Sequence, residues 1–199
     1  MKDVAKMALI LGAVGVVATG ILAGVEQATR GPIQEAVRQE ILAGLTVVLP
    51  PFDNAPDQDT VELAIGDPAG GTRTVYRARI GKEVVGAAFV ETAPDGYSGR
   101  IDILMGVTAA GVLSGIRVVQ HAETPGLGDK IVLDHAWVDF FKGKALGNPD
   151  EAHWKVKKDG GIFDQFTGAT ITPRAVVKAV KHGLDEFQSH RLTILGIHN

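Results

Sequence analysis

The sequence predicts an α+β fold: an N-terminal transmembrane helix followed by an antiparallel sheet flanked by helices. Three observations support this prediction. Residues 7–25 form an uncharged apolar run, two pairs of strand-like segments are each joined by a short glycine-containing turn, and helical patterns lie on both sides of these strands. No β–α–β order is present, so the pattern gives no reason to expect a parallel dinucleotide-binding sheet.

Composition excludes several functional classes. The chain has 199 residues, a net charge of -3 and no basic run, which gives no basis for binding nucleic acid. It contains no cysteine, so disulfides, iron–sulfur ligation and a cysteine nucleophile are excluded. The six histidines are scattered without metal-ligand spacing. We therefore predict no metal site and no catalytic residue of the chain's own.

The apolar run at residues 7–25 predicts a membrane anchor, which we place at residues 1–27. As a helix this run would reach about 28 Å, close to the hydrocarbon thickness of about 30 Å. Lys2 and Lys6 precede it, which favours a cytoplasmic N-terminus and places the rest of the chain in a bacterial periplasm. A cleaved signal peptide, cut near Ala23-Gly24, is the alternative. The run is longer than the 7–15 apolar residues typical of such a signal, which favours an uncleaved single span.

Residues 28–72 are predicted to form a juxtamembrane helix and a loop. The helix is expected at Pro32–Leu49, where Pro32 suits the first turn and Pro50-Pro51 ends the pattern. Its apolar face comprises Ile33, Ala36, Val37, Ile41, Leu45 and Val48. The following stretch to Gly71 is rich in proline, aspartate and glycine and indicates a loop, with one short strand at Val61–Ile65.

Residues 73–199 are predicted to form the folded domain. Two hairpins are expected, Arg73–Ile80 with Glu83–Thr92 and Arg100–Thr108 with Val112–His121, and the segment APDGYSG lies between them. A helix is expected at Asp129–Lys142, with Val132, Ala136, Trp137, Phe140 and Phe141 at core spacing. A last helix is expected at Pro173–Gln188, with a buried stripe of Val176, Val177, Val180, Leu184 and Phe187.

The segment DQFTGATIT, residues 164–172, has two interpretations. Thr172 followed by Pro173 suits a helix start, and Thr167 and Thr170 are then turn hydroxyls. The other interpretation is an anion site, because a helix start offers unpaired N–H groups and a positive dipole end. Gly168 lets the backbone come close to a ligand. These principles permit a phosphate beside Thr170 and predict no covalent bond.

The same segment resembles the flavinylation motif Dxx(S/T)GA(S/T)x(S/T), in which FMN is attached through its phosphate to the last threonine of the TGAT tetrad. Three stretches, GYSGRIDILMGV (96–107), HAETPGLGDKI (121–131) and residues 154–180, resemble the G subunit of the Rnf (Rsx) electron transport complex. The related C subunit of the sodium-translocating NADH:quinone reductase shares the general pattern and remains an alternative.

The resemblance implies a periplasmic FMN-binding domain with covalent FMN on Thr170, attached by a separate flavin transferase. The HxETPGLG loop is expected to line the flavin ring, and the GYSG turn is expected on its other side. Glu123 beside the ring would disfavour the anionic reduced form. The expected cofactor-binding residues are Asp164, Thr167, Gly168, Ala169, Thr170, Ile171, Thr172, Tyr97, Ser98, Glu123, Thr124, Gly126, Leu127 and Gly128.

The implied function is electron transfer within an Rnf complex of the inner membrane, which moves electrons between ferredoxin and NAD and couples this to ion translocation. The implied partners are the membrane, iron–sulfur and flavin subunits of that complex. The isolated chain is not assigned an enzyme activity; the complex is an oxidoreductase. Two other classes stay open: an anchored, non-redox binding module, and a flavin reductase with Glu123 or His121 as its acid or base.

Overall fold

The computed structural model describes residues 6, 12, 15, 18–20, 23, 35, 38–39, 41–64 and 71–197. The chain divides into two compact units, Met1–Ile41 and Leu42–Asn199. Most of the predicted anchor at residues 1–27 lies outside the described residues, as do residues 32–34, 36, 37 and 40 of the helix predicted from Pro32. Within the described ranges, none of the helices combines the length and the apolar character that crossing a bilayer requires.

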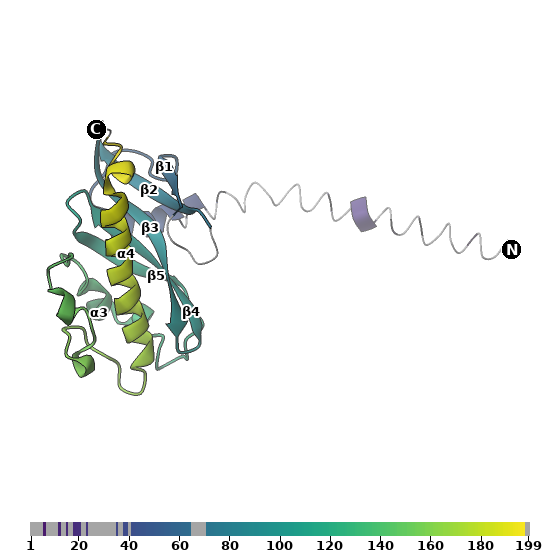
Figure 1. The fold of residues 1–199 in the computed structure, drawn as a ribbon. Helices are drawn as coiled ribbons and strands as arrows, with labels where there is room; N and C mark the ends of the chain where they lie inside the picture. The colour runs from purple at the N-terminus through teal and green to yellow at the C-terminus, as the bar shows by residue number, and fades with distance from the viewer. Residues whose placement is uncertain are drawn as a thin grey trace. The chain divides into compact units, whose positions relative to one another are not determined.

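The second unit is built on a five-stranded antiparallel sheet (Figure 1). Its strands are β1 (Thr60–Leu63), β2 (Arg73–Ile80), β3 (Glu83–Gly96), β4 (Gly99–Thr108) and β5 (Leu113–Gln120). The strands pair in sequence order from β1 to β5, so each turn joins neighbours. Both predicted hairpins are confirmed, and the turn between β2 and β3 has Gly81 at φ 59°.

One connection in the sheet differs from the sequence prediction. Strand β3 continues past Thr92 as far as Gly96, which pairs with Gly99 at the start of β4. Tyr97 and Ser98 therefore form a two-residue turn that closes a third hairpin. The sequence pattern did not predict this third hairpin, because the proline and glycines of APDGYSG are typical of a loop between separate hairpins.

Helix α4 (Ile171–Leu195) lies along one face of the sheet (Figure 1). The stripe predicted for this helix is buried against β3 and β4, which confirms it. The helix begins two residues earlier than predicted. Thr172 is not its N-cap: the side chain is fully buried in the first turn, and its hydroxyl donates to Glu123 at 2.5 Å. The helix also continues past Gln188 to bury Ile194, and it ends at Gly196 with φ 68°.

Residues 42–49 cover the other face of the sheet. Residues 41–48 are helical, and Leu45 and Val48 are fully buried, as the apolar pattern predicted. Gly106 in β4 pairs with Gly115 in β5, and the lack of side chains at both leaves room for the backbone of this segment. The hydroxyl of Ser114 donates to the carbonyl of Val48 at 2.5 Å. The backbone of this segment thus packs directly on the sheet.

Replacing Gly106 by alanine is expected to destabilise the domain by about 3 kcal/mol, because a Cβ there would lie 2.0 Å from the Val48 carbonyl oxygen. The matched change Gly115→Ala places its Cβ 3.1 Å from Val48 Cα, so its cost should be about 1 kcal/mol or less. Urea unfolding of both variants measures the difference. Equal costs would show that residues 42–49 do not pack on the sheet as described.

The predicted helix at Asp129–Lys142 is instead two short helices, α2 (Lys130–Leu133) and α3 (His135–Asp139). Asp134 separates them with ψ 87°, and its carboxylate accepts a hydrogen bond from the backbone N–H of Trp137. The break changes which side chains are buried: Ile131 lies inside, whereas Val132 and Ala136 are exposed, contrary to the prediction.

An aromatic cluster fills the space between α3, α4 and the short helices η1 (Glu151–His153) and η2 (Lys157–Asp159). Trp137 and Phe141 belong to the core, as predicted, while Phe140 is 43% exposed at its edge. The rings touch in a continuous series that comprises Trp137, Phe140, Phe141, Trp154, Phe163 and Phe166. This aromatic cluster lies directly beneath the segment that leads into α4.

Candidate functional site

The TGAT segment forms a tight turn immediately before α4. The backbone N–H of Ala169 donates to the carbonyl of Phe166 at 3.0 Å, and Gly168, third in this turn, has φ 81°. A positive φ at that position is the requirement of a type II turn, which explains the glycine on structural grounds. Thr167 is exposed at the corner of the turn, and Thr170 is partly exposed at the helix start.

The aromatic cluster holds this turn in place. The ring of Phe166 is buried and lies 5.2 Å from that of Trp137, centroid to centroid. The indole Nε1 of Trp137 donates to the carbonyl of Asp164 at 2.8 Å. The backbone on the N-terminal side of the turn is therefore fixed by both packing and a hydrogen bond, while the Asp164 carboxylate is exposed and pairs with Lys157 at 2.6 Å.

A second tight turn follows β5 in the ETPGLG segment. The backbone N–H of Leu127 donates to the carbonyl of Thr124 at 3.2 Å, with Pro125 second and Gly126 third, at φ 77°. Proline followed by glycine is the preferred pair for a type II turn, which accounts for Pro125 and Gly126 on structural grounds. The N–H of Gly128 also donates to Thr124, which leaves both of these amides engaged inside the loop.

Glu123 connects three loops that are far apart in sequence. Its side chain is buried, and one carboxylate oxygen accepts from the backbone N–H of Ser98 in the β3–β4 turn at 3.0 Å. The other oxygen accepts from the hydroxyl of Thr172 in the first turn of α4. The GYSG, ETPGLG and TGATIT segments thus meet at the start of α4.

The outer side of this meeting point carries apolar side chains that are open to solvent. Tyr97, Leu127 and Ile171 are 68%, 43% and 45% exposed, and each belongs to a different one of the three loops. Leu127 lies over the TGAT turn, because a Cβ built on Gly168 would be 3.5 Å from its Cδ2 atom. Exposed apolar side chains gathered from separate loops are typical of a surface that covers a ligand.

The start of α4 supplies donors for an anion. Thr170 occupies the N-cap position, yet its side chain makes no capping hydrogen bond. The N–H groups of Ile171 and Thr172 have no acceptor within the helix, and Pro173 has no N–H. Arg174 pairs with Asp159 at 2.7 Å and, through this hydrogen bond, holds the pKa of that carboxyl below its usual range. An anion at Thr170 would therefore be met mainly by backbone N–H groups.

The structure also shows contacts that the sequence pattern did not reveal. His121 makes a local contact, in which its Nδ1 accepts a hydrogen bond from the backbone N–H of Glu123 at 3.1 Å. The support of Asp164 by Trp137 spans 27 residues and has no sequence signature. Spacing could not detect the Glu123–Thr172 bond either, because it joins positions 49 residues apart.

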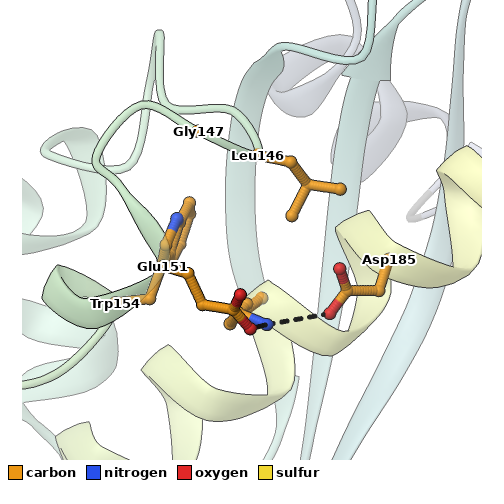
Figure 2. Close-up of a pocket in the computed structure, with 6 residues that line it drawn as sticks. Leu146, Gly147, Glu151, Trp154 and Asp185 are labelled. Atoms are coloured by element: carbon orange, nitrogen blue, oxygen red, sulfur yellow. Dashed lines mark hydrogen bonds and ion pairs between the residues drawn. The ribbon is translucent and has the colours of Figure 1, made fainter.

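A small cavity lies elsewhere on α4 (Figure 2). It has a volume of about 130 Å³ and is lined by Leu146, Gly147, Glu151, Trp154, Lys181 and Asp185. This is below the range of about 300–1,000 Å³ for small-molecule sites. Lys181 and Asp185 pair with each other at 3.2 Å, and Lys181 lies roughly 16 Å along the helix from Thr170 at about 1.5 Å per residue. The cavity is therefore separate from the three loops.

Comparison with known proteins places the chain in a family. Residues 96–185 match the model of the FMN-binding domain, and residues 1–48 match that of the RnfG N-terminal region. The G subunits of several ion-translocating oxidoreductase complexes are similar over most of the chain. The one from Pseudomonas aeruginosa is 46% identical, covering 98% of this chain and 93% of its own. The one from Escherichia coli is 44% identical, covering 91% and 89%.

The solved structures agree on the fold. NqrC of Shewanella oneidensis superposes with a TM-score of 0.50 at 24% identity, over 68% of each chain. The three loops and the sheet thus define an α+β protein with an FMN-binding domain. Within that class, the chain belongs to the family formed by the G subunits of ion-translocating oxidoreductase complexes.

Proposed function

We propose that this chain relays electrons within a membrane-bound, ion-translocating oxidoreductase complex, through FMN joined by its phosphate to the side-chain oxygen of Thr170. One observation carries the proposal. The three loops that resemble the flavin-binding segments of the family converge on the start of α4, where the Thr170 hydroxyl is partly exposed and makes no capping hydrogen bond.

The residues at this place fit FMN. The N–H groups at the start of α4 suit its phosphate, since backbone donors and the helix dipole both favour an anion there. Gly168 keeps the turn beside Thr170 free of a side chain. The exposed side chains of Tyr97, Leu127 and Ile171 offer apolar surface to an aromatic ring system. When bound, FMN supplies reversible transfer of one or two electrons.

Attachment needs a second protein, a flavin transferase with FAD as the flavin donor. The Thr170 hydroxyl oxygen forms a bond to the phosphorus of the FMN half of FAD. The pyrophosphate bond breaks, AMP leaves and the hydroxyl proton is released, so no oxidant or reductant is consumed. A covalent link suits a carrier outside the cytoplasm, where a dissociated flavin would be lost.

The rest of the chain supports an anchored carrier. The uncharged run at residues 7–25 serves as a single span with its N-terminus in the cytoplasm, so that the flavin domain lies in the periplasm of a bacterium. Because the chain has no cysteine for iron–sulfur clusters, its electron donor and acceptor are other subunits of the complex. The complex as a whole moves electrons between ferredoxin and NAD.

The test is a mass spectrum of the tryptic peptide Asp159–Arg174 from protein expressed with an active flavin transferase. The expected result is a mass increase equal to FMN less one water, located on Thr170 by fragmentation. An unmodified peptide, from cells that flavinylate a known substrate, would overturn the proposal and favour an anchored binding module. Steady turnover of soluble donors and acceptors by the isolated protein would favour a flavin reductase instead.

A further inference from the structure

We propose that Glu123 is a positioning residue that assembles the flavin site before the flavin arrives, and that it does not act on the flavin itself. This inference rests on the proposed function of Thr170. It assigns to Glu123 the task of holding the start of α4 against the β3–β4 turn, so that the Thr170 hydroxyl is presented in one geometry to the flavin transferase.

The hydrogen bonds of Glu123 support this role. The residue is 5% exposed, and its two carboxylate oxygens accept from Ser98 N–H at 3.0 Å and from the Thr172 hydroxyl at 2.5 Å. Thr172 is fully buried, two residues after Thr170. Each oxygen therefore already has a donor, one from the β3–β4 turn and one from the first turn of α4. The carboxylate is buried between these two segments.

The backbone of two other segments packs closely against the Glu123 carboxylate. A Cβ built on Gly96 would lie 2.8 Å from Glu123 Oε1, and one built on Gly128 would lie 2.7 Å from Oε2. Both distances are far below ordinary van der Waals contact, so the two glycines form a cradle that only an unsubstituted backbone permits. Gly96 belongs to the GYSG turn and Gly128 to the ETPGLG loop. Both glycines therefore let the backbone approach the Glu123 carboxylate closely.

This arrangement has a consequence for flavin attachment. Reactions between two proteins slow sharply when the reacting group is held in many geometries. With the Glu123 side chain removed, the Ser98 N–H and the Thr172 hydroxyl each lose a buried acceptor, and the start of α4 is no longer tied to the β3–β4 turn. The buried hydroxyl of Thr172 therefore positions the helix start, and the hydroxyl of the partly exposed Thr170 forms the bond to the phosphate.

The experiment measures the initial rate at which a flavin transferase attaches FMN from FAD to the purified full-length protein. Glu123→Ala and Thr172→Val are expected to lower this rate at least tenfold. Glu123→Gln keeps an acceptor for Ser98 and offers its amide as a donor to Thr172, and Thr172→Ser keeps the hydroxyl. Both are expected to stay within about twofold of the unchanged protein, and this rescue distinguishes positioning from mere filling of space.

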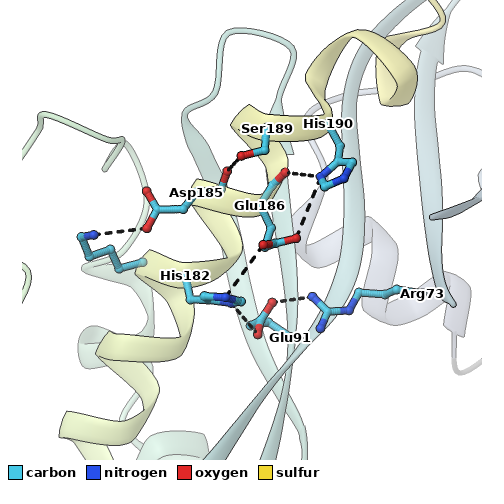
Figure 3. Close-up of polar contacts among 8 residues, drawn as sticks. Arg73, Glu91, His182, Asp185, Glu186, Ser189 and His190 are labelled. Carbon is cyan, nitrogen blue, oxygen red and sulfur yellow. Dashed lines mark hydrogen bonds and ion pairs between the residues drawn. The ribbon is translucent and has the colours of Figure 1, made fainter. Parts of the chain in front are cut away.

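A matched control comes from the other buried glutamate on the α4 side of the sheet, Glu91. It is 3% exposed and bound by Arg73 at 2.5 Å and by His182 at 3.3 Å (Figure 3). His182 lies about 18 Å along α4 from Thr170 at about 1.5 Å per residue. Glu91→Ala thus removes an equally buried carboxylate far from the site. It should lower the melting temperature and leave the attachment rate of the folded protein unchanged.

A second measurement needs no flavin. Amide hydrogen exchange at Ser98 in flavin-free protein should rise at least tenfold in Glu123→Ala, but not in Glu123→Gln or Glu91→Ala. Wild-type attachment rates and protected Ser98 in a folded Glu123→Ala protein would overturn the inference. Should the unchanged protein take up no flavin at all, the proposed function of Thr170 fails, while the exchange at Ser98 still decides whether Glu123 holds the loops together.

Discussion

Replacing Thr170 by alanine is expected to abolish covalent flavin while leaving the domain folded. The hydroxyl of Thr170 is the oxygen that would bond to the phosphate, and no other hydroxyl of the TGATIT segment is equivalent: Thr172 is buried against Glu123, and Thr167 lies across the turn. Because the Thr170 side chain makes no capping hydrogen bond, its removal should change the free energy of unfolding by no more than about 0.5 kcal/mol. Flavin absorbance, the mass of peptide 159–174 and urea unfolding measure these effects.

Two companion variants sharpen this result. Thr170→Ser keeps the nucleophilic oxygen and should still be flavinylated, because the family motif accepts either residue at this position. Thr193→Ala removes an exposed hydroxyl near the far end of the same helix and should leave the flavin content unchanged. If Thr170→Ala retained a stoichiometric, covalently held flavin, the linkage would lie on another residue and the proposal would be wrong.

The sequence was sufficient for two hairpins of the sheet, for the last helix and for the glycines of the two tight turns, because these features are encoded locally. Glycines at turn positions mark the hairpins, and Gly126 and Gly168 each supply the positive φ that a tight turn requires. The last helix was recognised from a stripe of valines, leucine and phenylalanine whose spacing depends only on its own period. These features need no knowledge of the rest of the chain.

Errors arose where a specific contact overrules a general sequence preference. Thr172 followed by Pro173 is a good helix start, but a hydrogen bond to Glu123 placed Thr172 inside the helix instead. Asp134 separates α2 from α3 because its carboxylate caps α3 by accepting a hydrogen bond from the backbone N–H of Trp137, although the apolar spacing continues through it. The segment APDGYSG lies between the two predicted hairpins, and the pairing of Gly96 with Gly99 closes a third hairpin there. The partner of Thr172 lies 49 residues away, whereas Asp134 and Gly96 are decided by local contacts that their sequence patterns do not indicate.

The aromatic cluster, predicted as ordinary core, has a further role that stability measurements can reveal. Trp137→Ala is expected to destabilise the domain by about 3–5 kcal/mol, since it removes a large side chain that is 5% exposed and touches Phe141 and Phe166. It also removes the donor to the Asp164 carbonyl. The loss should loosen the segment before the TGAT turn and lower flavin content as well as stability.

The contribution of the hydrogen bond can be separated from that of packing by a pair of conservative changes. Trp137→Phe leaves the Asp164 carbonyl without its 2.8 Å donor, whereas Trp154→Phe removes an Nε1 that is buried without a partner among the described residues. Both changes remove similar volume from the same cluster. Trp137→Phe should therefore cost about 1 kcal/mol more than Trp154→Phe in urea unfolding. Equal costs would mean that ring packing alone, without the indole hydrogen bond, holds the TGAT turn beside α4.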